Sequence, residues 1–191
     1  MRVRQAIIAS QPEERKASDW KPTDRLAKIK VASPFGVSTR KHKTNFGYAY
    51  GQGTVPCRID HRSSANHLSW DMAIDQIDFD PLLVNCFEGL LETDHPCSFI
   101  AMQALRELLQ AANADQKVAP IVGKCIMPLR LGLTSKDGKI WNNSIEATQL
   151  LAKAARENLV PHLHLLMGSF NAKMANKLTR EKVTATLGII E

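Results

Sequence analysis

The sequence predicts an all-α fold, a short solenoid of stacked helix pairs, preceded by an extended N-terminal arm. Pro81, Pro120 and Pro161 each open an apolar stretch, and they lie 39 and 41 residues apart. A period of about 40 residues is typical of paired-helix repeats. Only 6% of the residues are aromatic, as expected where Leu, Ile and Ala pack helices against each other. Such a stack is a binding scaffold more often than an enzyme.

Residues 1–33 carry scattered Ser, Lys, Arg and Pro without a hydrophobic period, and we expect a flexible or partner-ordered N-terminal extension there. Positive charge is concentrated in the same part of the chain. Residues 1–58 hold 12 Lys and Arg against 4 Asp and Glu, residues 59–107 hold 2 against 9, and residues 108–191 hold 11 against 6. This distribution indicates either an anionic partner for the basic part or a solvated tail.

Residues 34–70 are predicted to form an extended basic and aromatic arm. Three cationic side chains are followed by aromatic side chains at alternating positions, and a further cation comes later; the full set is Arg40, Lys41, Lys43, Phe46, Tyr48, Tyr50 and Arg58. Alternation is typical of an extended segment that lays one face on a surface. That surface is either a partner's or the protein's own domain, in which case Phe46, Tyr50 and Arg58 pin the arm to it.

Residues 71–191 are predicted to form the helical-repeat domain. Apolar residues at helical spacing indicate three helix pairs, at 81–92 with 97–112, 118–133 with 140–156, and 159–172 with 178–190. Asp80 is placed to cap the helix that Pro81 begins, and Pro128 is expected to kink the third helix. The last helix lacks a Gly stop or polar cap, so we expect either more chain after Glu191 or a covering element.

The sequence offers no motif for catalysis, a cofactor or a metal ion. Its four cysteines form no CxxC pair and are expected to be reduced packing residues. It contains no phosphate-binding glycine motif, and its acidic run from Asp71 to Asp80 lacks the Gly and Glu of a calcium loop. Because no catalytic constellation is found, we expect that the protein is not an enzyme. Because no apolar run reaches the length of a membrane span, we expect a cytosolic protein that does not enter membranes.

The stretch from residue 34 to residue 103 contains an ordered set of short, specific sequences: Pro34-Phe35-Gly36, Phe46, Ala49-Tyr50, Gly53, Val55-Pro56-Cys57-Arg58, Asp60-His61, Leu68, Trp70, Phe79-Asp80-Pro81-Leu82-Leu83, Glu88-Gly89-Leu90, Glu92-Thr93, His95-Pro96, Phe99 and Gln103. In this order they resemble the parkin co-regulated protein family, and they are most similar to its PACRG-like branch. The resemblance covers about residues 34–191 and is strongest at 46–103.

The resemblance implies an armadillo/HEAT-like fold without enzymatic activity or cofactor, and association with the microtubules of cilia and flagella. It implies a microtubule inner protein at or near the inner junction of doublet microtubules, with the tubulin lattice and other axonemal proteins as partners. The seven arm residues would then face the lattice. The alternatives are a soluble helical-repeat adaptor for a protein partner and a nucleic-acid-binding protein. The second alternative is disfavoured, because residues 59–107 are acidic and no nucleic-acid module is present.

Overall fold

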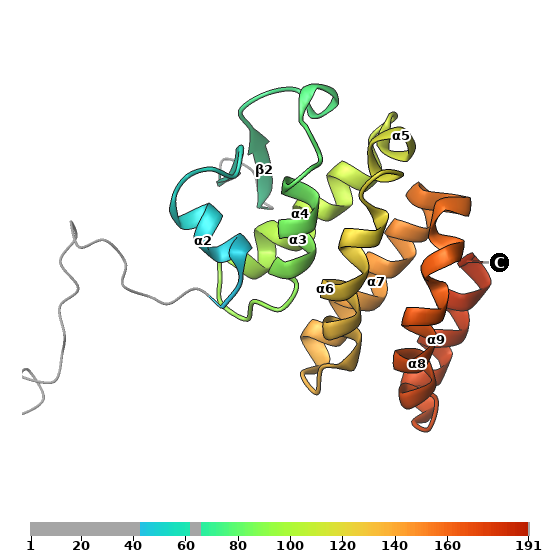
Figure 1. Ribbon diagram of the computed structural model, residues 1–191. Helices are drawn as coiled ribbons and strands as arrows, with labels where there is room; N and C mark the ends of the chain where they lie inside the picture. Colours follow the sequence, from blue (N-terminus) through green and yellow to red (C-terminus); the bar gives the residue numbers. More distant parts are fainter. Residues whose placement is uncertain (1–42, 62–65, 191) are drawn as a thin grey trace, which may run out of the picture. The chain divides into compact units, whose positions relative to one another are not determined.

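The computed structural model describes residues 43–61 and 66–190, which belong to one compact unit of the chain. These residues are mostly helical and include a small two-stranded hairpin (Figure 1). In chain order the elements are α2 (Asn45–Gly51), β1 (Cys57–Asp60), β2 (His67–Trp70), the 3-10 turn η2 (Ile74–Gln76), α3 (Leu82–Gly89), α4 (Cys97–Leu109), α5 (Ala114–Val118), α6 (Val122–Thr134), α7 (Gly138–Ala155), the 3-10 segment η3 (Arg156–His162), α8 (Leu163–Lys173) and α9 (Lys177–Ile190).

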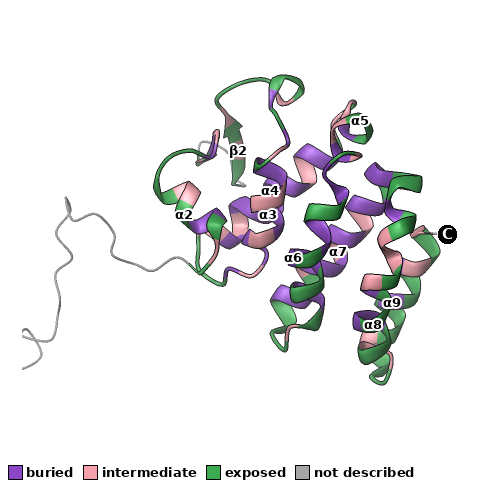
Figure 2. Ribbon diagram, viewed as in Figure 1, coloured by how far each residue is buried: buried purple, intermediate pink, exposed green. Residues whose placement is uncertain are grey.

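The longer helices pack in two rows. Helices α3, α6 and α8 lie side by side in one row, and α4, α7 and α9 lie side by side in the other. Each helix of the first row also contacts the helix that follows it in the second row, so the rows are joined pair by pair. The buried residues line the space between the rows (Figure 2), and large fully buried side chains there include Phe87, Leu105, Ile126 and Leu129.

The predicted helix pairs correspond to helices of the structure, but two of the predicted helices begin later than expected. The predicted helix 118–133 corresponds to α6, which begins at Val122, and the separate short helix α5 ends at Val118; the start of the predicted helix 159–172 is the 3-10 segment η3. Pro81 is the N-cap residue of α3, where no side chain caps the helix. Asp80 is therefore not the cap that we predicted, and its carboxylate pairs instead with the ammonium group of Lys124 on α6. Pro128 lies inside α6.

The prediction of an extended conformation throughout residues 34–70 is wrong at Asn45–Gly51, which is the helix α2. Aromatic side chains two residues apart fit a strand, but the first and third of them are also four apart, the spacing of neighbours on one helix face. Two segments of the predicted arm do form strands: β1 and β2 pair antiparallel, with Cys57 opposite Trp70 and Asp60 opposite His67. Helix α2 contacts α3 and α4, so the helical body begins before residue 71.

The predicted extension 1–33 lies outside the described residues, as do Arg40 and Lys41. Among the residues that the structure describes, no helix is long and apolar enough to cross a membrane.

Candidate partner-binding site

Two carboxylates hold the start of α2 on the C-terminal end of α3. The Thr44 hydroxyl accepts a hydrogen bond from the Gly47 amide, so Thr44 is the N-cap of α2. The Thr44 amide and hydroxyl also donate to Glu92 Oε1 at 2.9 and 2.8 Å, and the Asn45 amide donates to Glu88 Oε2 at 3.2 Å. Carboxylates are favoured at the N-terminus of a helix, where backbone amides lack partners. These bonds explain why the segment is helical and where it begins.

Phe46 and Tyr50 form the inner face of α2. Their rings stack with centroids 6.5 Å apart, and Phe46 is fully buried. The ring of Phe46 fits against Gly89 of α3, because a Cβ atom at residue 89 would lie 2.8 Å from Phe46 Cγ and 2.6 Å from Ala101 Cβ. Tyr50 is half-buried, and burial raises the pKa of its phenol. Phe46 is thus part of the core and is not available to a partner in this fold.

The other described arm residues are exposed. Tyr48 projects from the outer face of α2 with 62% of its surface exposed. Lys43 donates a hydrogen bond to the carbonyl oxygen of Leu91 at 3.1 Å. Arg58 forms an ion pair with Asp71 at 2.9 Å, and 73% of its side chain remains exposed. The structure therefore separates the predicted set into buried anchors of α2 and exposed groups, and partner contact by the exposed groups stays a prediction.

The hairpin is fastened to the second row of helices by a polar network that the sequence did not reveal. The Trp70 indole donates to Glu107 Oε2 at 2.5 Å, and Gln103 donates to Glu107 Oε1 at 2.9 Å. Arg106 donates to both carboxylate oxygens of Glu146 on α7, at 2.6 and 3.0 Å. The hydrogen bond to Glu146 is the largest cause that raises the pKa of Arg106. The network links the hairpin, α4 and α7, and only the fold brings its members together.

The four cysteines are free thiols, and three of them are buried. Burial raises the pKa of Cys57 and of Cys125 to about 12 and that of Cys86 well above its ordinary value. A thiol with a raised pKa is protonated at neutral pH and is a poor nucleophile. Within residues 43–61 and 66–190, no group of three or more His, Cys, Asp or Glu is placed to hold a metal ion.

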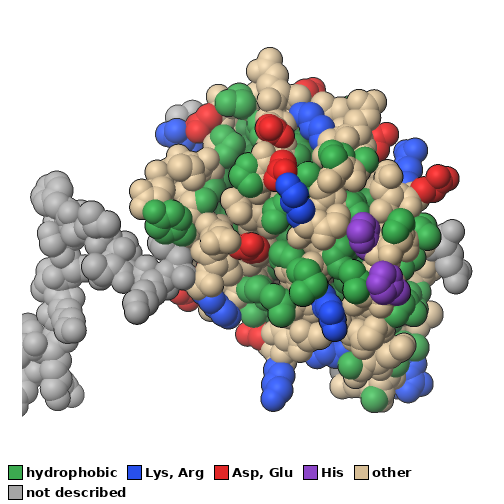
Figure 3. All heavy atoms as spheres, viewed as in Figure 1, with side chains coloured by type: hydrophobic (Ala, Val, Ile, Leu, Met, Phe, Trp, Pro, Cys, Tyr) green, Lys and Arg blue, Asp and Glu red, His purple; other side chains and the backbone are tan. Residues whose placement is uncertain are grey.

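Charge is divided unevenly between the helical body and the chain before it. The described residues hold 14 Lys and Arg and 14 Asp and Glu, so their net charge is zero. Residues 1–42 hold 10 Lys and Arg and 4 Asp and Glu, so their net charge of +6 equals that of the whole chain. The face of the body in Figure 3 agrees with this count, because its acidic and basic side chains are interspersed among hydrophobic ones. The excess of positive charge in the sequence therefore lies in the residues that precede Lys43.

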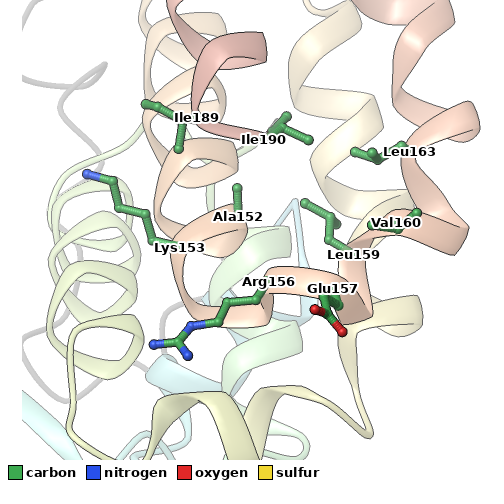
Figure 4. Close-up of a pocket in the computed structure, with 9 residues that line it drawn as sticks. All are labelled: Ala152, Lys153, Arg156, Glu157, Leu159, Val160, Leu163, Ile189 and Ile190. Atoms are coloured by element: carbon green, nitrogen blue, oxygen red, sulfur yellow. The ribbon is translucent and has the colours of Figure 1, made fainter.

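A pocket lies where the ends of α7 and α9 meet η3 and the start of α8 (Figure 4). Its volume is about 350 Å³. The wall is aliphatic, and Lys153, Arg156 and Glu157 line it as well. Sequence reasoning missed this pocket, because its residues come from separate elements and form no motif. The exposed aliphatic residues Val160 and Ile189 belong to it, but their exposure is visible only in the folded chain.

Comparison with known proteins gives the family. A family model described as "Parkin co-regulated protein" matches residues 44–186, from the N-cap residue of α2 to a buried threonine of α9. The chain is also similar to the Parkin coregulated gene protein homolog of Mus musculus, with 24% identity over 131 residues, which are 67% of this chain and 54% of that protein. The chain thus spans about half the length of this curated relative. Since the family model covers far more than half of its residues, the chain belongs to the parkin co-regulated protein family.

Proposed function

We propose that this protein is a non-catalytic structural component of the ciliary or flagellar axoneme that binds the αβ-tubulin lattice. Membership of the parkin co-regulated protein family is the observation that carries the proposal. The family resemblance further suggests a microtubule inner protein, at or near the inner junction of doublet microtubules, with other axonemal proteins as neighbours. Cytoskeletal localisation is part of the same proposal.

The helical body fits the role of a rigid spacer. Its two rows of helices, joined pair by pair, support the interpretation as a short armadillo/HEAT-like stack. Repeat stacks of this kind present extended binding surfaces, so a stack that spans the space between two partners would set the distance between them.

The N-terminal basic segment fits the role of the lattice-binding element. Microtubules have a strongly acidic surface, and residues 1–42 carry the whole net positive charge of the chain. Attraction between exposed charges is long-range and is screened by salt, so binding through this segment is expected to weaken as the ionic strength rises. Arg40 and Lys41 lie in this segment, Lys43 follows it, and Tyr48 adds an exposed aromatic ring next to it.

Microtubule co-sedimentation of the full chain tests this role. The double variant Arg40→Glu/Lys41→Glu leaves the Lys43–Leu91 hydrogen bond in place and should bind more weakly than the wild type at low salt. The matched control is Lys136→Glu/Lys139→Glu, which makes the same change in net charge at two exposed lysines, one in the α6–α7 connection and one in the first turn of α7. An equal loss of microtubule binding in both variants would mean that only the net charge of the protein matters. Unchanged binding in both variants would mean that Arg40 and Lys41 do not contribute to lattice binding.

Localisation separates this proposal from the adaptor alternative. The pocket between α7 and α9 is the observation that favours an adaptor, because it offers a second place for a protein partner. A tagged full-length chain expressed in a ciliated cell is expected along the axoneme, in register with doublet microtubules. A uniform distribution through the cytosol would instead support a helical adaptor without a microtubule role.

A further inference from the structure

The pocket at the ends of α7 and α9 has an aliphatic interior that is left partly uncovered. Ala152 and Leu159 are buried and form its floor, whereas Val160 is 59% exposed and Ile189 is 38% exposed on its walls. Figure 4 shows these side chains together with Leu163, which also lines the pocket. Aliphatic groups that border a hollow gain free energy when another apolar group fills it.

The rim of the pocket carries two cations, Lys153 and Arg156. Lys153 lies in the last turn of α7, and Arg156 follows the end of that helix. Within the described part of the chain, neither side chain forms an ion pair or a side-chain hydrogen bond. In Figure 4 both extend to the same side of the opening, while Glu157 lies apart from them below Leu159. The rim on the side of α7 is therefore suited to carboxylates.

The backbone at Arg156 is held in an unfavourable conformation. Its φ angle is 47° and its ψ angle is −126°, which lies outside the left-handed region that side-chain-bearing residues occasionally adopt. This residue turns the chain from α7 into η3, and η3 supplies Leu159 and Val160 to the pocket. Unfavourable backbone conformations are found preferentially at binding sites, where the surrounding fold maintains them.

We propose that this pocket binds a segment of a partner protein that presents a bulky apolar side chain flanked by carboxylates. The volume of about 350 Å³ is near the lower end of the range for ligand pockets and suits an anchoring side chain. Charge complementarity with Lys153 and Arg156 selects acidic neighbours for that side chain. The inference goes beyond the proposed binding of tubulin, because it uses a different surface, at the end of the helical body away from α2.

Methyl NMR spectroscopy of the full chain, labelled at Ile, Leu and Val, tests the proposal. The probes are two short acetylated peptide amides, EELFEE and its cationic counterpart KKLFKK. The acidic peptide should cause saturable shifts at the methyl groups of Val160, Leu163 and Ile189. The cationic peptide should bind about fivefold more weakly than the acidic one, because two exposed charge pairs become two repulsions.

Charge reversal provides the decisive comparison. In Lys153→Glu/Arg156→Glu the preference should invert, so that KKLFKK binds more tightly than EELFEE. In the control Lys136→Glu/Lys139→Glu, which has the same net charge, the preference for the acidic peptide should persist. Val160→Ser replaces an exposed wall residue with little risk to folding and should weaken the binding of both peptides.

Three results would overturn the proposal. The first is the absence of saturable shifts at the pocket methyl groups with either peptide. The second is equal binding of both peptides by the wild type, which would remove the role of the two cations. The third is a set of pocket shifts that depends on protein concentration without peptide, which would identify a second copy of this chain as the occupant.

Discussion

The two ends of the helical body are completed in different ways. At the α2 end, α2 and the hairpin cover α3 and α4, and Phe46 is fully buried beneath them. At the α9 end, Val160 and Ile189 remain exposed around a hollow. Aromatic side chains follow the same division: the described residues before 101 include seven Phe, Tyr and Trp, and those after it include Trp141 and Phe170. Large rigid rings fill the first end, and smaller aliphatic groups leave the second end able to receive a partner.

The largest expected effect follows from removing the ring that fills the α2 end. Phe46→Ala should lower the free energy of unfolding by about 3–5 kcal/mol, because a fully buried aromatic side chain leaves a cavity. Urea denaturation followed by circular dichroism measures the change. Tyr48→Ala, two residues away but 62% exposed, is the control and should change stability by about 0.5 kcal/mol or less. Similar effects of both substitutions would contradict the division of α2 into an inner and an outer face.

A methyl group added to glycine should have opposite effects at the two ends. Gly89→Ala places a Cβ atom 2.6 Å from Ala101 Cβ and should cost about 1–3 kcal/mol through overpacking. Gly188→Ala in α9 meets nothing within 4 Å and should stabilise the protein by about 0.5–1 kcal/mol, because alanine is the better helix former. Thermal unfolding of the two variants shows whether each substitution raises or lowers the stability of the protein. A stabilising Gly89→Ala would show that α2 sits loosely on α3.

The hydrogen bonds that start α2 should have an intermediate effect. Thr44→Ala removes the N-cap and one hydrogen bond to Glu92, and should cost about 0.5–2 kcal/mol. Thr184→Ala in α9 is the matched control, since its hydroxyl donates only to the carbonyl oxygen of Arg180 within its own helix. This control is expected to be neutral or slightly stabilising. Chemical denaturation of both variants decides the point, and a neutral Thr44→Ala would argue against capping.

The smallest effect is expected at the surface of the hairpin. Arg58→Ala breaks the ion pair with Asp71, whose partners are 73% and 47% exposed, and should change stability by less than about 0.5 kcal/mol. The same variant is therefore usable in binding experiments. A stability loss as large as that of Thr44→Ala would mean that the hairpin depends on this pair as well as on Trp70.

Much of the helical body could be predicted because its signals are local. The apolar stripe in 97–112 matched α4, Cys97–Leu109, and the pattern in 140–156 matched α7, Gly138–Ala155. In both helices the residues that predict the helix are also the residues that it buries, so local pattern and tertiary packing agree. Family membership was also predictable, from short matches along residues 34–103.

The two candidate sites could be predicted only in part, because their features depend on distant contacts. The aromatic spacing at Phe46, Tyr48 and Tyr50 fits a strand and a helix equally, and the carboxylates that favour the helix are 43 and 48 residues away in the sequence. The α9 pocket combines residues from 152 to 190 without any motif. The concentration of basic residues, in contrast, was visible in the sequence, and the structure sharpens it by showing that the described body has no net charge.

The attachment of α2 has a mechanical consequence. Tension on the chain ahead of Lys43 would reach the body at Thr44 and Asn45, whose hydrogen bonds to Glu92 and Glu88 are loaded together. Bonds that share a load must break simultaneously. The junction therefore resists more force than it would if the same bonds broke one after another. If the basic segment holds a moving filament, the load enters the helical body through this junction. The carboxylates of Glu88 and Glu92 then transmit the load from the basic segment to the stack of helices.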